Sequence, residues 1–117
     1  MISGVGIDIV KSKRFASYED KHSPFLTKIF TDSELDYCFR ASTPSHSLAG
    51  KFAAKEAIIK IFTNQGMNIS HLKEIEILND ASGLPFVNSF PLEIDRNKIR
   101  LSISHDGGFA IAIALME

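Results

Sequence analysis

Alternating apolar positions predict a β-strand near the start of the chain, over residues 4–10. One row of this strand is apolar, and we expect it to be the buried row: Val5, Ile7 and Ile9. Asp8 lies in the opposite row together with Gly4 and Gly6. Because glycine has no side chain, another backbone or a ligand can come close to this second face. The pattern therefore places Asp8 on a face that a neighbouring group can reach.

A second alternating pattern, near the end of the chain, predicts an antiparallel hairpin of residues 99–105 and 109–115. Its last strand has a row of large apolar residues and a row of alanines: Phe109, Ile111, Ile113 and Leu115 against Ala110, Ala112 and Ala114. A strand that is apolar on both faces is typical of one covered on both sides. We therefore expect a closely packed helix on one face and a subunit contact on the other. Residues 75–87 predict a further hairpin, in which Pro85 lies at an edge or at the first position of its strand.

Helices are predicted between these strands. Thr31 and Glu34 have the spacing of a capping box, which predicts that a helix begins there, and Cys38 follows as a small core residue. The longest helix is expected over residues 48–62, and the polar residues 11–23 are expected to form a short basic helix or loop. Together the elements predict an α+β fold, in which the long helix packs on an antiparallel sheet.

One charged residue interrupts the apolar surface of the long helix. Glu56 lies at the centre of a stripe, with Lys60 one turn later, and the rest of the stripe is apolar: Ala49, Phe52, Ala53 and Ile59. A carboxylate in such a stripe must be paired, protonated or bound to a cation, because burying it alone costs too much free energy. Two interpretations are open at this point: a structural pair of Glu56 with Lys60 on a solvated face, and a functional carboxylate.

Length and composition limit the classes of protein. The 117 residues suit one domain, which we expect to span residues 1–117, and 44% hydrophobic with 23% charged residues excludes global disorder. A formal net charge of −1 argues against an electrostatic binder of nucleic acid or of anionic membranes. The amino terminus lacks the pattern of a signal peptide or a membrane span. One cysteine excludes a disulfide framework and a multi-thiolate zinc site, so we expect a cytoplasmic protein.

The polar residues that stand out come from widely separated segments: Asp8, Glu56, Lys60 and the run 104–106. Two carboxylates without dedicated histidine or cysteine partners suit Mg²⁺, which completes its coordination with water and phosphate oxygens. The Ser-His-Asp run 104–106 is not expected to be a catalytic triad, because neighbouring strand residues point to opposite faces. These residues therefore indicate phosphate chemistry.

Four segments occur in a characteristic order and spacing: GIDIV at 6–10, AGKFAAKEAIIK at 49–60, NDASGLP at 79–85 and SISHD at 102–106. Together they resemble the holo-acyl-carrier-protein synthases, a family of small 4'-phosphopantetheinyl transferases. The resemblance implies the 4'-phosphopantetheinyl transferase fold, assembled as a homotrimer with sites between subunits. It also implies transfer of the phosphopantetheine arm of coenzyme A to a serine of an apo acyl carrier protein, with release of adenosine 3',5'-bisphosphate, in fatty acid biosynthesis and lipid metabolism.

The resemblance also implies roles for individual residues. Asp8 and Glu56 match the family's Mg²⁺ ligands, and Lys60 matches the lysine that contacts the coenzyme A phosphates, so these three are the catalytic candidates. The coenzyme A site is implied to include Lys60 and four further residues: Lys51, Pro85, Ser104 and His105. Lysine stands at position 51 where the family usually has arginine, which loses bidentate phosphate geometry. The segment that docks the acidic carrier protein is matched by three basic residues: Lys11, Lys13 and Arg14.

The implied mechanism is electrostatic positioning. Mg²⁺ on Asp8 and Glu56 orients the pyrophosphate while the carrier serine attacks the β-phosphorus in line. The serine proton passes to Glu56 or to a metal-bound water, and the sequence leaves this choice open. Two other functions are open: a Mg²⁺-dependent hydrolase of coenzyme A, and a trimeric binding module without chemistry. The loop 61–66 departs from the glycine-rich loop common in the family, so no contacts are carried over to it.

Overall fold

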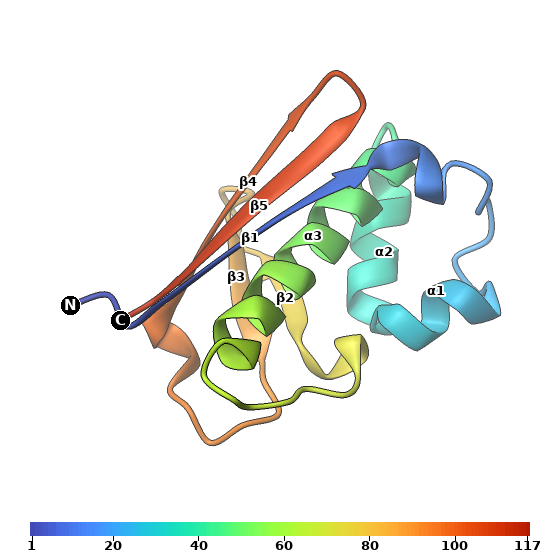
Figure 1. Ribbon diagram of the computed structural model, residues 1–117. Coiled ribbons are helices and arrows are strands. Elements are labelled where there is room, and N and C mark those ends of the chain that lie inside the picture. The colour runs from blue at the N-terminus through green and yellow to red at the C-terminus, as the bar shows by residue number, and fades with distance from the viewer.

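The computed structural model describes residues 1–117 and contains five strands and three α-helices (Figure 1). The strands are β1 (Gly4–Lys11), β2 (Glu76–Asn79), β3 (Pro85–Ser89), β4 (Ile99–Asp106) and β5 (Phe109–Met116). The α-helices are α1 (Pro24–Ile29), α2 (Asp32–Arg40) and α3 (Pro44–Thr63). Short 3₁₀ helices lie at Ser12–Phe15, Leu72–Glu74 and Arg96–Lys98. None of the helices combines the length and the apolar character needed to cross a membrane.

The strands form two antiparallel sheets, and α3 lies between them. In the larger sheet the order is β1-β5-β4, so the first strand of the chain pairs with the last one. β2 and β3 form a separate hairpin on the other side of α3, and α1 and α2 pack near one end (Figure 1). The predicted α+β architecture, a long helix packed on an antiparallel sheet, is confirmed.

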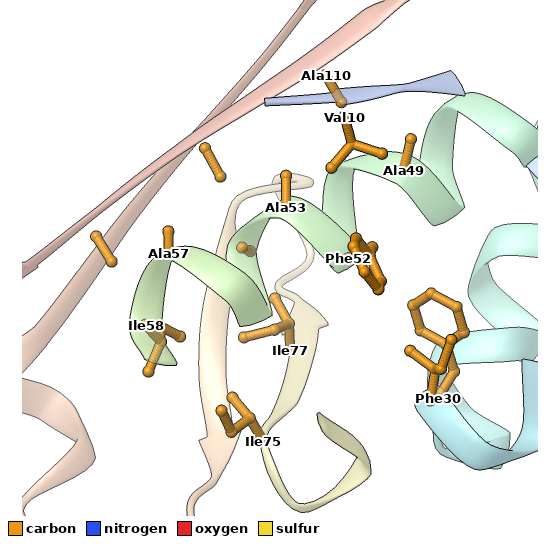
Figure 2. Close-up of a cluster of buried hydrophobic side chains, with 14 of the residues drawn as sticks. Val10, Phe30, Ala49, Phe52, Ala53, Ala57, Ile58, Ile75, Ile77 and Ala110 are labelled. Atoms are coloured by element: carbon orange, nitrogen blue, oxygen red, sulfur yellow. The ribbon is translucent and has the colours of Figure 1, made fainter. Parts of the chain in front are cut away.

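Small residues allow α3 to lie close against the three-stranded sheet. A side chain at Gly6 would place its Cβ 1.8 Å from the carbonyl oxygen of Ala57, so only glycine fits there. The alanine row of β5 is fully buried under the same helix: Ala110, Ala112 and Ala114. Figure 2 shows Ala110 and Val10 pointing toward α3. The expected close helix contact on the small face of the last strand is therefore present.

The other face of this sheet is exposed, which corrects the expectation for β1. The row expected to be buried is 53%, 58% and 58% exposed: Val5, Ile7 and Ile9. The buried row is the glycine row, because only a row of small side chains leaves room for α3. Large residues of β5 lie beside the exposed row of β1, with Ile7 paired to Ile113 and Ile9 to Ile111. A continuous apolar face thus lacks a partner within one chain.

The core surrounds α3, since twelve of its twenty residues are buried. Ile75 and Ile77 of the β2 region and Phe30 pack from the side opposite the large sheet (Figure 2). Any polar residue on this helix therefore either needs a partner inside the protein or must lie on one of its few open positions.

Several local predictions can be compared directly. The capping box is confirmed, since Glu34 N donates to Thr31 Oγ1 at 3.3 Å and Thr31 N donates to Glu34 Oε1 at 2.8 Å. Cys38 is fully buried, as expected, and Pro85 is the first residue of β3. α3 begins four residues earlier than expected, at Pro44, because proline fits the first turn of a helix. The six-residue α1 was not predicted; it is too short to show a helical period.

Candidate functional site

The three candidate catalytic residues lie together where β1 passes α3. Lys60 Nζ donates to the carbonyl oxygen of Ile7 at 2.8 Å and to Asp8 Oδ1 at 3.1 Å. Glu56 precedes Lys60 by one helical turn and lies near enough to Asp8 for the two charges to interact. The Asp8 side chain is 17% exposed and that of Lys60 is 50% exposed. The cluster is therefore anchored in the protein on one side and open to solvent on the other.

The electrostatics of this cluster favour an additional cation. Burial raises the pKa of Glu56 and the charge of Asp8 raises it further, while Lys60 and Arg14 act in the opposite direction. Two carboxylates supply the hard oxygen donors that Mg²⁺ prefers, and their repulsion falls when a divalent cation lies between them. No group of three or more histidine, cysteine or acidic residues is placed to bind a metal. Water or substrate oxygens would have to complete the coordination of a cation held by this pair.

The basic residues at positions 11–14 are divided between two places. The Cζ atom of Arg14 lies 4.9 Å from the ring centroid of Phe52, within cation–π range, on the side of the Glu56 cluster. Lys11 and Lys13 line a separate cavity of about 430 Å³ beside the β4–β5 turn. The segment thus presents positive charge both next to the carboxylates and at the far end of the sheet.

A second group of candidate residues lines a cavity of about 200 Å³ between α2, the β2–β3 turn and β4. Its walls contain Lys51, Pro85 and His105, together with residues that the sequence did not single out: Tyr37, Ser47, Gly50, Asn79, Gly83 and Ile103. His105 Nε2 donates to the carbonyl oxygen of His46 at 2.8 Å, which holds its ring against the start of α3. The side chain of His105 fits because residue 50 is glycine, whose added Cβ would lie 2.9 Å from Nε2.

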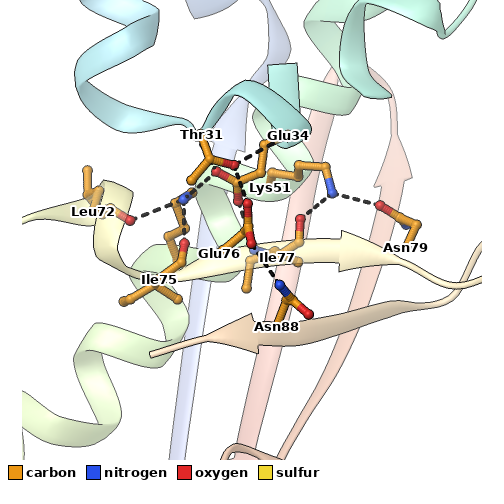
Figure 3. A network of polar contacts seen from close by, with 10 residues as sticks. Thr31, Glu34, Lys51, Leu72, Ile75, Glu76, Ile77, Asn79 and Asn88 are labelled. Atoms are coloured by element: carbon orange, nitrogen blue, oxygen red, sulfur yellow. Dashed lines mark hydrogen bonds and ion pairs between the residues drawn. The ribbon is translucent and has the colours of Figure 1, made fainter. Parts of the chain in front are cut away.

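Lys51 is held inside the wall of this cavity. Its side chain is only 3% exposed, and Nζ donates to the carbonyl oxygen of Ile77 and to Asn79 Oδ1, both at 2.7 Å (Figure 3). The ring of Tyr37 lies 4.7 Å from the same nitrogen. Burial lowers the pKa of Lys51. Its ammonium is therefore mainly engaged with the protein itself.

One chain does not bring the two groups of candidate residues together. Glu56 follows Lys51 by five positions, which is about 140° around the helix axis. Asp8 lies on β1 and His105 on β4, the two opposite edges of the three-stranded sheet. Ser104 lies outside the cavity, because residues alternate along β4 and its side chain belongs to the exposed face. The carboxylate cluster and the cavity are thus two separate groups of residues within one chain, on different faces of α3.

The sequence did not indicate a buried ion pair that supports the cavity. Lys55 Nζ donates to Glu34 Oε1 at 2.8 Å, and both side chains are fully buried. The same carboxylate accepts from Ile77 N at 2.8 Å, so α2, α3 and β2 meet at one polar junction (Figure 3). The sequence signal that could have indicated this pair was Lys55 itself, a further charged residue in the apolar part of the long helix.

Comparison with known proteins places this chain in a family. The model of the 4'-phosphopantetheinyl transferase superfamily matches residues 4–114. The chain is similar to the holo-acyl-carrier-protein synthase of Halothermothrix orenii, with 39% identity over 100% of this chain and 98% of the relative. It is also similar to that of Thermodesulfovibrio yellowstonii, with 40% identity over 99% of each.

Solved structures agree with this match. The holo-(acyl-carrier-protein) synthase of Bacillus anthracis in complex with CoA (3',5'-ADP) superposes with a TM-score of 0.77 and 34% identity, over 99% of this chain and 96% of that chain. The synthase of Neisseria meningitidis gives 0.77 and 30%, over 100% and 99%. The chain therefore belongs to the 4'-phosphopantetheinyl transferase superfamily and, within it, to the holo-acyl-carrier-protein synthases, a family of transferases. This membership confirms the predicted class of enzyme over the alternatives of a hydrolase and a binding module.

Proposed function

We propose that this chain transfers the 4'-phosphopantetheine arm of coenzyme A to a serine of an apo acyl carrier protein, with Mg²⁺, and releases adenosine 3',5'-bisphosphate. The names of the relatives and of the superfamily support this reaction, and the complex of the Bacillus anthracis relative with CoA (3',5'-ADP) supports coenzyme A as the donor. The observation that carries the proposal for this chain is the cluster of Asp8, Glu56 and Lys60, two partly buried carboxylates with one half-exposed lysine.

Asp8 and Glu56 are the residues that would hold Mg²⁺. When bound, the ion supplies positive charge to the pyrophosphate of coenzyme A. The carrier serine oxygen forms a bond to the β-phosphorus, and the bond from that phosphorus to the bisphosphate oxygen breaks. The proton of the serine would pass to a base, either the Glu56 carboxylate or a water molecule. Lys60 offers its half-exposed ammonium to the leaving phosphate.

The coenzyme A site is assigned to the cavity at β4 and to Lys60. Pro85 and His105 line this cavity, Lys51 lies within its wall, and Ser104 lies on the adjoining exposed face of the sheet. The cavity holds only about 200 Å³, which is less than the size typical of a site that encloses a whole cofactor. A second surface is therefore needed to complete it.

A homotrimer with sites between subunits supplies that second surface. The exposed face of β1 and β5 carries large apolar residues in adjacent rows, which is typical of a protein contact. A cyclic arrangement would place the carboxylate cluster of one subunit beside the cavity of the next. This accounts for the separation of Asp8 from His105 within one chain, on opposite edges of the sheet.

The carrier protein docks on the basic segment, where Arg14 lies on the side of the carboxylate cluster and Lys11 and Lys13 extend the positive surface. The protein acts as a single catalytic domain over residues 1–117, in the cytoplasm, in fatty acid biosynthesis. Neither nucleic acid nor a membrane has a part in this reaction.

Product analysis tests the proposed reaction. The protein is incubated with coenzyme A and Mg²⁺, with an apo carrier protein or with the same carrier in which the acceptor serine is alanine. Chromatography is expected to show adenosine 3',5'-bisphosphate only in the reaction with the serine carrier, and not in the same reaction run in EDTA. Consumption of coenzyme A without any carrier would contradict transfer and indicate a hydrolase.

Mixing two inactive variants tests the shared sites. Asp8→Asn removes a carboxylate and His105→Ala alters the cavity, so each homo-oligomer should lose activity. When the two are unfolded together and refolded at equal amounts, about one quarter of the sites in a cyclic oligomer regain both wild-type halves. The mixture is therefore expected to recover about one quarter of the wild-type activity. Activity no higher than in the separate variants would contradict sites shared between subunits.

A further inference from the structure

A chain of hydrogen bonds connects the buried Lys51 to the turn between β2 and β3. Lys51 Nζ donates to Asn79 Oδ1 at 2.7 Å, and Asn79 Nδ2 donates to the carbonyl oxygen of Gly83 at 3.1 Å. Asn79 therefore uses both ends of its amide, the acceptor toward α3 and the donor toward the turn (Figure 3 shows the first contact). Three of the cavity's lining residues, Lys51, Asn79 and Gly83, are thus joined in one series.

The turn itself has little other support from the body of the protein. Asp80 Oδ1 accepts from the backbone nitrogens of Ser82 and Leu84, and the Asp80 nitrogen donates to the Leu84 carbonyl, all within the turn. Gly83 adopts a φ of +87°, which fixes the shape of the turn and favours glycine. These contacts determine the turn's internal shape, and the Asn79–Gly83 bond ties that shape to the side chain held by α3.

Lys51 has little capacity left for a ligand. Two of its three N–H groups point to protein oxygens, the Tyr37 ring covers the ammonium at 4.7 Å, and the side chain is 3% exposed. A direct phosphate ligand would be expected to present its charge to the cavity. The geometry instead matches a lysine that anchors neighbouring groups.

We propose that Asn79, anchored by Lys51, is a positioning residue that holds the β2–β3 turn in place as a wall of the coenzyme A cavity. Lys51 then contributes to coenzyme A binding through Asn79 rather than by contact with a phosphate. This inference rests on the proposed function, because it assumes that the cavity binds coenzyme A.

Two substitutions at one position separate the possible roles. Asn79→Ala removes both ends of the amide, whereas Asn79→Asp keeps an acceptor for Lys51 and removes only the donor to Gly83. Both variants are expected to weaken coenzyme A binding by about 5–10-fold in titration calorimetry, the range that loss of a hydrogen bond produces. Hydrogen exchange at the Gly83 and Leu84 amides should accelerate in both. Asn88→Ala is the matched control, since Asn88 Nδ2 donates to Glu76 Oε1 at 2.8 Å in the same small sheet but outside the cavity.

The donor molecule distinguishes positioning from direct contact. Because the turn acts by its position, the variants should lose affinity for coenzyme A and for 3'-dephospho-coenzyme A by the same factor. Lys51→Met should behave in the same way, and the double variant Lys51→Met with Asn79→Ala should be no weaker than the worse single variant. The Asn79 variants alone decide the test if Lys51→Met does not fold.

Three results would overturn the inference: wild-type affinity in Asn79→Asp, a loss of affinity in Asn88→Ala equal to that in Asn79→Ala, or a larger loss for coenzyme A than for its dephospho form. Failure of the proposed function looks different, because the wild-type protein would then bind neither donor.

Discussion

Replacing Lys55 by methionine is expected to be among the most destabilising single changes in this protein. Lys55 and Glu34 form an ion pair whose side chains are both fully buried, and Lys55 also donates to the carbonyl oxygens of Leu72 and Ile75. Methionine fills a similar volume but leaves the carboxylate of Glu34 buried without its cation. Removing one partner of such a pair costs about 3–5 kcal/mol, a large part of a typical stability of about 5–15 kcal/mol.

The assay is urea unfolding followed by circular dichroism, at one fixed protein concentration so that assembly does not change. In thermal unfolding, the melting temperature of Lys55→Met should be lower by about 12–20 °C, because a chain of this length loses about 4 °C per kcal/mol. The double variant Glu34→Gln with Lys55→Met should be more stable than Lys55→Met alone, because it contains no unpaired buried charge. A loss below about 1 kcal/mol for Lys55→Met, or no recovery in the double variant, would refute this reasoning.

Three further predictions concern the site and its supports. Gly6→Ala should cost at least about 2 kcal/mol and reduce activity, because its Cβ would lie 1.8 Å from the Ala57 carbonyl oxygen and push α3 from β1. Gly4→Ala should cost less in the same unfolding assay, because its Cβ would meet side-chain atoms of Ile61 and Gln65 rather than backbone, and equal costs would contradict the packing argument. Glu56→Gln should abolish turnover yet, in buffer with EDTA, unfold at higher urea than the wild type at pH 7.5, by up to about 1 kcal/mol. The raised pKa of Glu56 means that ionisation costs stability as the pH rises above the ordinary carboxyl value of 4.5, so the difference should disappear as the pH falls toward that value, and a difference independent of pH would contradict it. Cys38 should resist iodoacetamide at pH 8 in the native protein and react in urea, because burial raises the pKa of its thiol to about 11; rapid native alkylation, read by mass spectrometry, would contradict this.

The sequence predicted the sheet, the long helix and the capping box because each has a strong local signal. The prediction of the buried face of β1 was wrong. The apolar row that was expected to be buried, Val5, Ile7 and Ile9, is exposed, and the glycine row is buried. The pattern rule assumes that the more apolar face of a strand is buried, but close helix packing requires the smaller face. The exposed row is instead available for contact with another subunit.

The candidate site shows a similar limit. Asp8, Glu56 and Lys60 stood out because charges at apolar or glycine-lined positions are unusual, and the fold brings them together. Tyr37 could not be found in this way, since an aromatic residue is ordinary within a helix, and Asn79 was part of the quoted segment 79–85 but had no role assigned to it. Their position in the cavity depends on how α2, β2 and β4 meet, which only the tertiary structure determines.

Intact-mass spectrometry of an apo acyl carrier protein tests the central claim most directly. The carrier is incubated with coenzyme A, Mg²⁺ and either the wild-type protein, Asp8→Asn or Glu56→Gln, with an EDTA control and with circular dichroism to verify folding. We expect the carrier to gain the mass of one phosphopantetheine with the wild-type protein and with neither variant. In the control reaction that contains EDTA from the start, no gain is expected. No gain with folded wild-type protein and several carriers would contradict the transferase, and a full gain with either variant would contradict the role of the two carboxylates.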